Sequence, residues 1–354
     1  MINKVNEEKI KEYLSNKFKG KIIDVKIDKL GEGLVGTGYS ISFKLNNKNE
    51  RKIFKTLFAD ANLDLNHHSD RARSLLLAHD SYNKMDKHVK SIDVVGIDEM
   101  GDLVSIGDSK EFFILMEEAE GKDFFKDFEE PNEKTNEKIA KLAEFLIKLH
   151  ENKRDSSGEY KRKLRDTIGS NCLMGMVDSY PADLNWTSGN EIGEIVKRCI
   201  DYWIKTRNMS HRLCEIHGDF HPGNLWFKED GDFTVLDRAR GTYGEAADDL
   251  TAFLINPIFY SLAKKGNFEG TYKEMFDLFW NTYFGKTKDK EMRKVMAPYF
   301  AFRVAVVCNP HFYKDDFFGG IEKARRVRRK LFNFALNVLK DDDFKPEKIN
   351  EYLS

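Results

Sequence analysis

The chain has 354 residues, which suggests about two domains. Its 58 basic and 59 acidic residues leave a net charge of -1, so no overall charge attracts nucleic acid or an anionic membrane. No apolar run approaches the ~20 residues of a membrane-spanning helix. The four cysteines lack C-x-x-C spacing, and the N-terminal stretch lacks a signal region, so we expect a cytoplasmic protein without a zinc knuckle or disulfide scaffold.

The first third of the chain predicts a small antiparallel sheet with two helices. Residues 1–18 have the periodicity of an amphipathic helix, and a second helix is expected from an N-cap at Ser69 to Met85. The apolar positions of the first helix are Ile10, Tyr13 and Leu14. Strands are expected where apolar and polar residues alternate between turn residues. They lie at residues 21–30, 38–45, 51–58, 91–97, 103–107 and 111–117.

From about Glu118 the sequence is mainly helical. Apolar residues at helical spacing predict a helix at 136–153, whereas residues 154–190 are polar and are expected to form an elaborated loop. Further helices are expected at Ile192–Arg207, Asp248–Leu262, Tyr272–Phe284, Met292–Val307 and Ile321–Leu339. In the last of these, the basic run "EKARRVRRK" is interpreted as the solvated edge of a core-facing helix rather than as a nucleic-acid or lipid surface.

The stretch "GEGLVGTGYS" places Gly31, Gly33 and Gly36 in a G-x-G-x-x-G pattern. Glycines allow backbone N–H groups to approach phosphate oxygens where a side chain would collide. This loop is expected between antiparallel strands rather than at the start of a helix, which favours a flap over a nucleotide and disfavours a Rossmann fold. An ordinary glycine-rich hairpin explains the same residues equally well.

Lys55 is expected on one strand face with Ile53 and Leu57, so its ammonium would lie among apolar side chains. A buried lysine needs an anionic partner. That partner would be a nucleotide phosphate together with a helix carboxylate, Asp80 or its competitor Asp70. The alternative is an edge-strand lysine whose ammonium reaches solvent.

The stretch "EFFILMEEAEG" is expected to run from a strand into a hinge at Glu117–Ala119. If the two halves of the chain enclose a cleft, the backbone of Glu117 and Ala119 could hydrogen-bond a purine edge. A plain strand-to-helix connection is equally compatible with this stretch alone.

The stretch "EIHGDFHPGNLWF" crowds polar residues between apolar runs. His217 and His221 could bind zinc from one helical face, but the glycines and the proline between residues 218 and 223 make a helix implausible. Asp219, Asn224 and Asp237 offer only oxygen donors, which suits Mg²⁺ carrying nucleotide phosphates. Asp219 could also accept a hydroxyl proton. Alternatively, Asp219 and Asn224 only cap a tight turn.

Taken in chain order, "GEGLVG", Lys55, "ILMEEAEG", "HGDFHPGN" and "VLDRARG" resemble the aminoglycoside phosphotransferase and choline kinase-like superfamily over about residues 20–340. The resemblance implies a bilobal α+β protein-kinase-like fold. A small antiparallel-sheet lobe (residues 1–116) would bind the nucleotide, and a larger, mainly helical lobe (residues 117–354) would carry the catalytic and substrate-binding residues. ATP would lie between them.

The resemblance also implies roles for individual residues. Asp219 would be the catalytic base, Asn224 and Asp237 would bind Mg²⁺, and Lys55 would contact the ATP phosphates. His217 would brace the catalytic loop, and Asp249 in "GEAADDLTAF" would hold that loop in place. Many relatives have an aromatic and then an acidic residue after the metal-binding aspartate. Here Arg238 and Arg240 follow it, and we interpret them as surface arginines, although they could bring positive charge to the metal end of the cleft.

We therefore expect an ATP- and Mg²⁺-dependent phosphotransferase with a small-molecule hydroxyl acceptor that the sequence does not identify. A protein kinase-like enzyme is one alternative, weakened by the short segment after Asp237, which has no A-P-E ending. A nucleotide-binding scaffold without turnover is another, weakened by the presence of Asp219, Asn224 and Asp237. No nucleic acid, membrane or obligate protein partner is expected.

Overall fold

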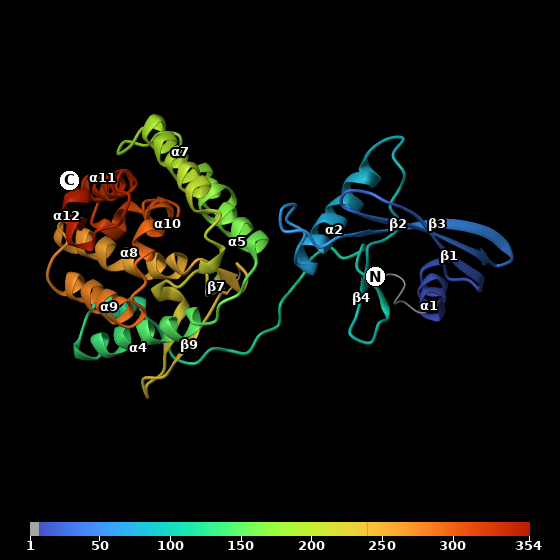
Figure 1. Cartoon of the computed structure of the whole chain (residues 1–354), viewed down its shortest axis with the longest axis horizontal. Helices are drawn as coiled ribbons and strands as arrows, with labels where there is room; N and C mark the ends of the chain where they lie inside the picture. Colours follow the sequence, from blue (N-terminus) through green and yellow to red (C-terminus); the bar gives the residue numbers. More distant parts are fainter. Residues whose placement is uncertain (1–6, 239) are drawn as a thin grey trace. The chain divides into compact units, whose positions relative to one another are not determined.

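The computed structural model describes residues 7–238 and 240–354. The chain divides into two compact units, Met1–Met116 and Glu117–Ser354, and each is considered by itself (Figure 1). The first unit carries an antiparallel sheet and the second is mainly helical, so the predicted α+β class with this order of elements is confirmed.

The first unit begins with α1 (Glu7–Phe18), whose buried side chains are Ile10, Tyr13 and Leu14. These are the three residues whose helical spacing predicted an amphipathic helix, so that prediction is confirmed. Residues 1–6, which the prediction also included, lie outside the described residues.

Three antiparallel strands, β1 (Ile22–Glu32), β2 (Gly36–Leu45) and β3 (Lys48–Leu57), form a sheet in the order β1-β2-β3. Alternate side chains of the central strand, Ile41 and Phe43, are buried with those of α1, because successive residues of a strand face opposite sides. The alternating pattern of the sequence therefore predicted this sheet correctly.

The helix α2 (His68–Lys84) starts before the predicted cap. Its N-cap is His67, and Ser69 already lies inside the helix. The backbone N–H of His67 donates to Oδ2 of Asp70 at 3.0 Å, which is the reciprocal half of a capping box. The prediction of a Ser69 cap was wrong because it overlooked a carboxylate that reaches back to the chain entering the helix.

Two further strands, β4 (Val95–Ile97) and β5 (Leu103–Ser105), pair antiparallel within the first unit. They confirm two predicted strands, although both are shorter than expected. The strand predicted at residues 111–117 is absent, because no strand in the described part of the chain pairs with this segment. Apolar composition produces a strand only where a neighbour satisfies its backbone groups.

In the second unit the predicted helix at 136–153 is α4 (Glu133–His150). Asn132 caps it by accepting from the N–H of Lys134 at 3.0 Å, and Ile139 and Leu142 are among its buried side chains. This end of the helix is therefore held by a side chain that the periodicity alone did not identify.

The helix α8 (Ala246–Lys265) is buried on all sides between Ala246 and Ala263. It packs against both α9 (Thr271–Thr287) and α10 (Met292–Val307) (Figure 1). A helix that is apolar around its whole circumference belongs in the centre of a core. Its position matters for function because its first turn carries Asp249, which accepts hydrogen bonds from the loop containing Asp219, and Asp248, which pairs with Arg303 of α10.

The predicted loop at 154–190 is largely helical. It contains α5 (Ser157–Leu164), a π-helical turn (Arg165–Gly169) and α6 (Asn171–Asp178), and α7 (Gly189–Thr206) begins before its end. The loop prediction was wrong because α5 and α6 are too short to show a clear period. The buried positions of α5 are Tyr160, Lys163 and Leu164.

The remaining elements of the second unit are short, apart from α11 (Ile321–Val338). Buried Ala324, Val327 and Leu331 confirm that α11 faces the core, as expected for "EKARRVRRK". The short elements are β6 (Lys122–Asp123), α3 (Phe125–Glu129), β7 (Cys214–Glu215), β8 (Leu225–Phe227), β9 (Phe233–Val235), β10 (Tyr243–Gly244) and α12 (Ile349–Tyr352). All four cysteines are free, and none of the described helices is long and apolar enough to cross a membrane.

Candidate active site

The loop between β7 and β8 contains the "HGDFHPGN" stretch, and a buried carboxylate of α8 holds its first turn. Asp249 accepts hydrogen bonds from the backbone N–H groups of His217 at 2.8 Å and Gly218 at 2.6 Å. Gly218 has a φ of +88°, a conformation that disfavours side chains. The prediction that Asp249 holds this loop is therefore confirmed.

Oδ2 of Asp249 also lies 3.2 Å from Nε2 of His150. Burial alone would raise the pKa of the Asp249 carboxyl, but its hydrogen bonds to His150 and to the two backbone N–H groups lower it overall. The carboxylate is consequently a fixed negative charge beneath the loop, and its position in the first turn of α8 also suits the helix dipole.

The two histidines of the loop brace its backbone. The N–H of Asp219 donates to Nδ1 of His217 at 3.3 Å, and the N–H of Gly223 donates to Nδ1 of His221 at 3.1 Å. The loop is not α-helical, so the two rings do not share a helix face. Within the described residues no group of three or more His, Cys, Asp or Glu side chains could hold a metal ion, which gives no support to a zinc site.

Asp219 has one carboxylate oxygen engaged by two arginines. Nη2 of Arg240 and Nη1 of Arg303 each donate to Oδ1 at 2.7 Å. Burial would raise the pKa of this carboxyl, but the charges of Arg303 and Arg240 outweigh burial and lower the pKa to about 2. Asp219 is therefore an anion throughout the neutral range.

The other oxygen of Asp219 remains available. In the described part of the chain Oδ2 accepts no hydrogen bond, and the ring nitrogen Nε2 of His221 lies 3.8 Å away. Because the side chain of Asp219 is 35% exposed, a hydroxyl group can reach this oxygen. The two carboxylate oxygens of Asp219 therefore differ: Oδ1 is bound by two arginines, and Oδ2 can contact a substrate.

Asn224 and Asp237 lie at the same end of the β8–β9 hairpin. Asn224 precedes β8, Asp237 follows β9, and the N–H of Leu236 donates to the carbonyl of Asn224 at 2.9 Å. The amide Nδ2 of Asn224 donates to the carbonyl of Asp219 at 3.0 Å, which leaves Oδ1 as the free amide atom. Asp237 is exposed and has a φ of +58°, a left-handed conformation that aspartate adopts more readily than most residues with a side chain.

The two arginines after Asp237 differ from each other. Arg238 pairs with Glu215 at 2.7 Å and is partly exposed, as expected of a surface arginine. Arg240 instead turns inward to Asp219, so the surface interpretation was wrong for this residue. The ion pair with the Asp219 carboxylate holds the side chain of Arg240 inside the site.

Sequence reasoning missed Arg303 on α10 and Asp248 on α8. Nη2 of Arg303 donates to Oδ1 of Asp248 at 2.5 Å, and both side chains are buried. A signal was present in the sequence, because Arg303 interrupts the apolar run "APYFAFRVAVV" and a charge buried in such a helix requires a partner. Nothing in the sequence identified which carboxylate that partner would be.

Lys163 of α5 is a buried lysine that contacts the segment carrying Arg240. Its Nζ donates to the carbonyl of Arg240 at 2.6 Å, and burial lowers the pKa of its ammonium. This lysine therefore supports the backbone of the segment that carries Arg240. It too lay in the stretch predicted to be a loop.

The glycine-rich stretch of the first unit is the hairpin between β1 and β2, as expected. Gly31 pairs with Gly38 across the strands, and the N–H of Gly33 donates to the carbonyl of Gly36 at 2.8 Å. A Cβ on Gly36 would lie 1.9 Å from the carbonyl oxygen of Thr56, so close strand packing alone requires glycine there. The roles of Gly31 and Gly33 at a nucleotide remain predictions.

Lys55 lies on β3 opposite Gly38 and is exposed, so it is not an ammonium buried among apolar side chains. Asp80 on α2 is also exposed, and within residues 7–238 and 240–354 no ion pair joins it to Lys55. Asp70 serves the capping box of α2. The predicted contacts of Lys55, Asp80, Glu117 and Ala119 with a nucleotide stay predictions.

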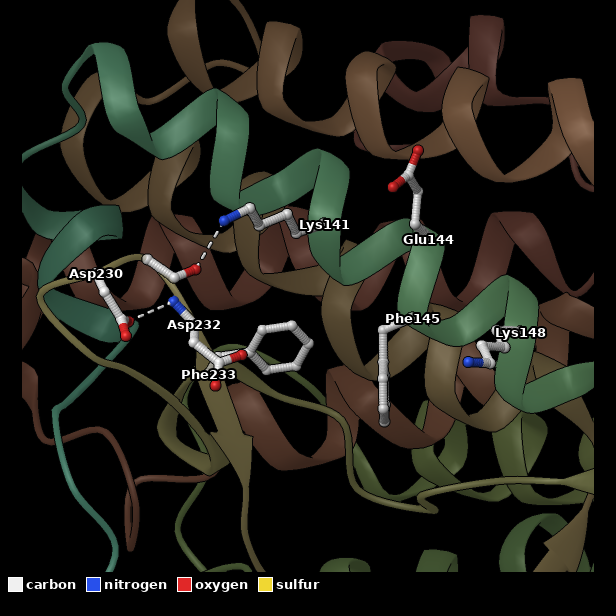
Figure 2. A pocket seen from close by; sticks show the side chains of 8 residues that line it. Lys141, Glu144, Phe145, Lys148, Asp230, Asp232 and Phe233 are labelled. Carbon is white, nitrogen blue, oxygen red and sulfur yellow. Dashed lines mark hydrogen bonds between the residues drawn. The ribbon is translucent and has the colours of Figure 1, made fainter.

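A groove shown in Figure 2 lies between α4 and the β8–β9 hairpin. Nζ of Lys141 donates to the carbonyl of Gly231 at 2.8 Å. The rings of Phe145 and Phe233, which also line the groove, pack edge to face. None of the predicted site residues lines this groove. It is therefore separate from the arrangement around Asp219.

Comparison with known proteins gives one family match. The model of the phosphotransferase enzyme family matches residues 56–274, more than half of the chain. That range includes Asp219, Asn224, Asp237 and Asp249. No curated protein sequence matches the chain.

Three similar solved structures illustrate the range of structural matches. The amicoumacin kinase hAmiN, in complex with AMP-PNP, Ca²⁺ and Ami, is 12% identical with a TM-score of 0.42, and the match covers 92% of this chain and 95% of that one. The streptomycin–ATP–APH(2")-IIa ternary complex is 15% identical with a TM-score of 0.33, covering 85% and 90%. Choline kinase from Cryptosporidium parvum Iowa II is 11% identical with a TM-score of 0.34, covering 98% and 92%. Because all three TM-scores lie below 0.5, the family assignment rests on the family model alone.

Proposed function

The chain belongs to the phosphotransferase enzyme family, and from this premise we propose that it transfers the γ-phosphoryl group of Mg·ATP to a hydroxyl group of a small molecule. One observation carries the proposal. Asp219 presents a free carboxylate oxygen, Oδ2, and lies on the same loop as Asn224. Asn224 and Asp237 lie at the same end of the β8–β9 hairpin.

The donor set fits a hard divalent cation. Asn224 has its amide nitrogen engaged and its amide oxygen free, and Asp237 adds an exposed carboxylate. Oxygen donors of this kind are the ligands that Mg²⁺ takes in proteins, usually together with substrate phosphates. Asn224 and Asp237 would hold the ion, which neutralises phosphate charge when it is bound.

Asp219 would orient the acceptor hydroxyl. Its Oδ2 accepts the hydroxyl hydrogen bond and directs the oxygen lone pair at the γ-phosphorus, as in-line transfer requires. A carboxyl with a pKa of about 2 is a weak base, so it takes the proton only as the new O–P bond forms. The oxygen–phosphorus bond to ADP breaks in the same transfer.

The first unit would supply nucleotide contacts, and so would the segment that begins the second unit. Lys55 carries the cation suited to phosphate oxygens, and the glycines of the β1–β2 hairpin carry no side chain that would keep a phosphate from the backbone. The proposed nucleotide-binding residues are Gly31, Gly33, Gly36, Lys55, Asp80, Glu117 and Ala119.

The experiment that tests this function is a screen of hydroxyl-bearing metabolites and aminoglycosides that follows ADP release. We expect ADP formation that depends on both an acceptor and Mg²⁺, with the phosphorylated acceptor detected by mass spectrometry. ATP binding without ADP release for any acceptor would instead support a nucleotide-binding scaffold. Phosphorylation of protein substrates alone would support the protein kinase alternative.

A further inference from the structure

Arg303 is a buried arginine that joins two aspartates from different elements. Its Nη1 donates to Oδ1 of Asp219 at 2.7 Å, and its Nη2 donates to Oδ1 of Asp248 at 2.5 Å. The side chain is 5% exposed, and that of Asp248 is 1% exposed. One guanidinium therefore ties the loop that carries Asp219 to the first turn of α8.

The position is a costly one for a charge. The side chain is almost fully shielded from water, the ring of Phe302 lies 4.8 Å from its Cζ, and among the described residues its buried Nε has no hydrogen-bond partner. Replacing buried ion pairs by apolar residues is often neutral or stabilising, so stability alone explains such a residue poorly. A better explanation is that the planar guanidinium binds two carboxylates at once and so fixes their positions relative to each other.

We propose that Arg303 is a positioning residue for phosphoryl transfer. It occupies Oδ1 of Asp219, which leaves Oδ2 as the single oxygen able to receive the acceptor hydroxyl. Asp248 accepts from the other terminal nitrogen, Nη2, and so anchors the guanidinium. The proposal rests on the proposed function, because it assigns the oxygen through which Asp219 acts.

Arg303 and Arg240 have different contributions to this geometry. Arg240 belongs to the segment between β9 and β10, and its side chain is 21% exposed. Arg303 belongs to α10, which packs against α8 and α11. Side chains on packed helices hold a site more rigidly than side chains on loops, so Arg303 sets the orientation of Asp219 and Arg240 adds to its charge.

The test compares kcat and KM for Arg303→Met and Arg303→Lys with the acceptor found by the screen. We expect Arg303→Met to lower kcat by roughly 10²-fold, the usual cost of a misplaced catalytic group, with KM for ATP changed by less than about threefold. Arg303→Lys should recover about tenfold of that loss, because an ammonium reaches one carboxylate but cannot bridge both. An unchanged kcat in Arg303→Met overturns the proposal.

A double variant separates positioning from general damage. If Arg303 acts through Asp219, Asp219→Asn combined with Arg303→Met should be no slower than Asp219→Asn alone. Losses that multiply would mean that Arg303 acts independently of Asp219, and the proposal would then be wrong.

The chain offers a matched control in Arg328 of α11. Its side chain is 4% exposed, close to the 5% of Arg303. It donates to Asp315 at 2.5 Å, and the ring of Phe318 lies 5.0 Å from its Cζ. Arg328→Met should lower the melting temperature but keep kcat. Equal losses of kcat in the two variants would show that Arg303 is only structural.

The remaining outcomes are also decisive. If Arg303→Met melts below the assay temperature, Arg303→Lys alone carries the test, and a wild-type kcat in that variant overturns the proposal. Loss of turnover in Asp219→Asn with full turnover in Arg303→Met contradicts the inference but not the function. Full turnover in Asp219→Asn contradicts the function, and the inference with it.

Discussion

Arg240 donates from Nη2 to Oδ1 of Asp219 at 2.7 Å, which connects the segment after β9 to the loop before β8. The contact explains why the carboxyl has a low pKa and why one of its oxygens is occupied. A carboxylate held in this way is suited to orienting a hydroxyl group, and that role can be separated from nucleotide binding by substitution.

Asp219→Asn should keep ATP and Mg²⁺ binding but lower kcat by roughly 10²–10⁴-fold, the usual contribution of general acid–base assistance. The amide cannot accept the hydroxyl proton, whereas Lys55, Asn224 and Asp237 are unchanged. Calorimetry with Mg·ATP and acceptor-dependent ADP release measure the two effects. Near-full activity together with a lowered melting temperature would show that Asp219 only caps the turn.

Asp237→Asn should weaken Mg²⁺ binding and turnover together. It removes one of the two proposed metal ligands and leaves an amide that binds the cation less strongly. The measurement is the Mg²⁺ concentration that gives half-maximal ADP release, which should rise at least about tenfold while excess Mg²⁺ restores part of the activity. An unchanged Mg²⁺ requirement would exclude Asp237 as a ligand.

Asp249→Asn should destabilise the second unit by about 3 kcal/mol, because a buried amide NH₂ group would face a backbone N–H that now donates to a carboxylate. Urea unfolding measures this loss. Turnover should fall as well, since one of the two backbone N–H groups, of His217 or of Gly218, loses the acceptor that fixes the loop. The control is Asp277→Asn on the exposed surface of α9. A similar loss of stability in that variant would mean that the effect is not specific to the buried position of Asp249.

Lys55→Ala should raise KM for ATP by about tenfold without lowering the melting temperature. Lys55 is exposed on β3, so truncation opens no core cavity, while a proposed phosphate contact disappears. Lys52→Ala on the same strand is the control, because Lys52 pairs with Glu50. If both variants have wild-type kcat/KM for ATP, Lys55 is an ordinary strand lysine.

Glu191 should make stability depend on pH below neutrality. A hydrogen bond from Arg329 is the main cause that lowers its pKa to about 2, so the unfolded chain binds the proton first as the pH falls. The stabilisation is complete above about pH 5 and disappears as the pH falls towards 2. Glu191→Gln should lower the melting temperature by about 2–4 °C at pH 7, equivalent to about 1 kcal/mol. A difference between the two proteins that is as large at pH 2 as at pH 7 would assign the effect to shape rather than charge.

The sequence by itself determined the features that depend on neighbouring residues. Alternation predicted β1, β2 and β3, and helical spacing predicted α1, α4 and the bounds of α10. The glycines and the proline of "HGDFHPGN" excluded a helix there, and the short turn after β8 brought Asn224 and Asp237 to one end of a hairpin. These patterns are local because the backbone period and the turn residues act within a few positions.

Tertiary structure alone decided which charges meet at Asp219. Arg303 lies 84 positions along the chain from that aspartate, and only the packing of α10 against α8 brings it there. Tertiary structure also turned Arg240 inward, folded residues 157–178 into helices and left residues 111–117 without a strand. The cause is the same in each instance. A buried charge, a short helix or a strand is stable only with a partner, and the partner is distant in sequence.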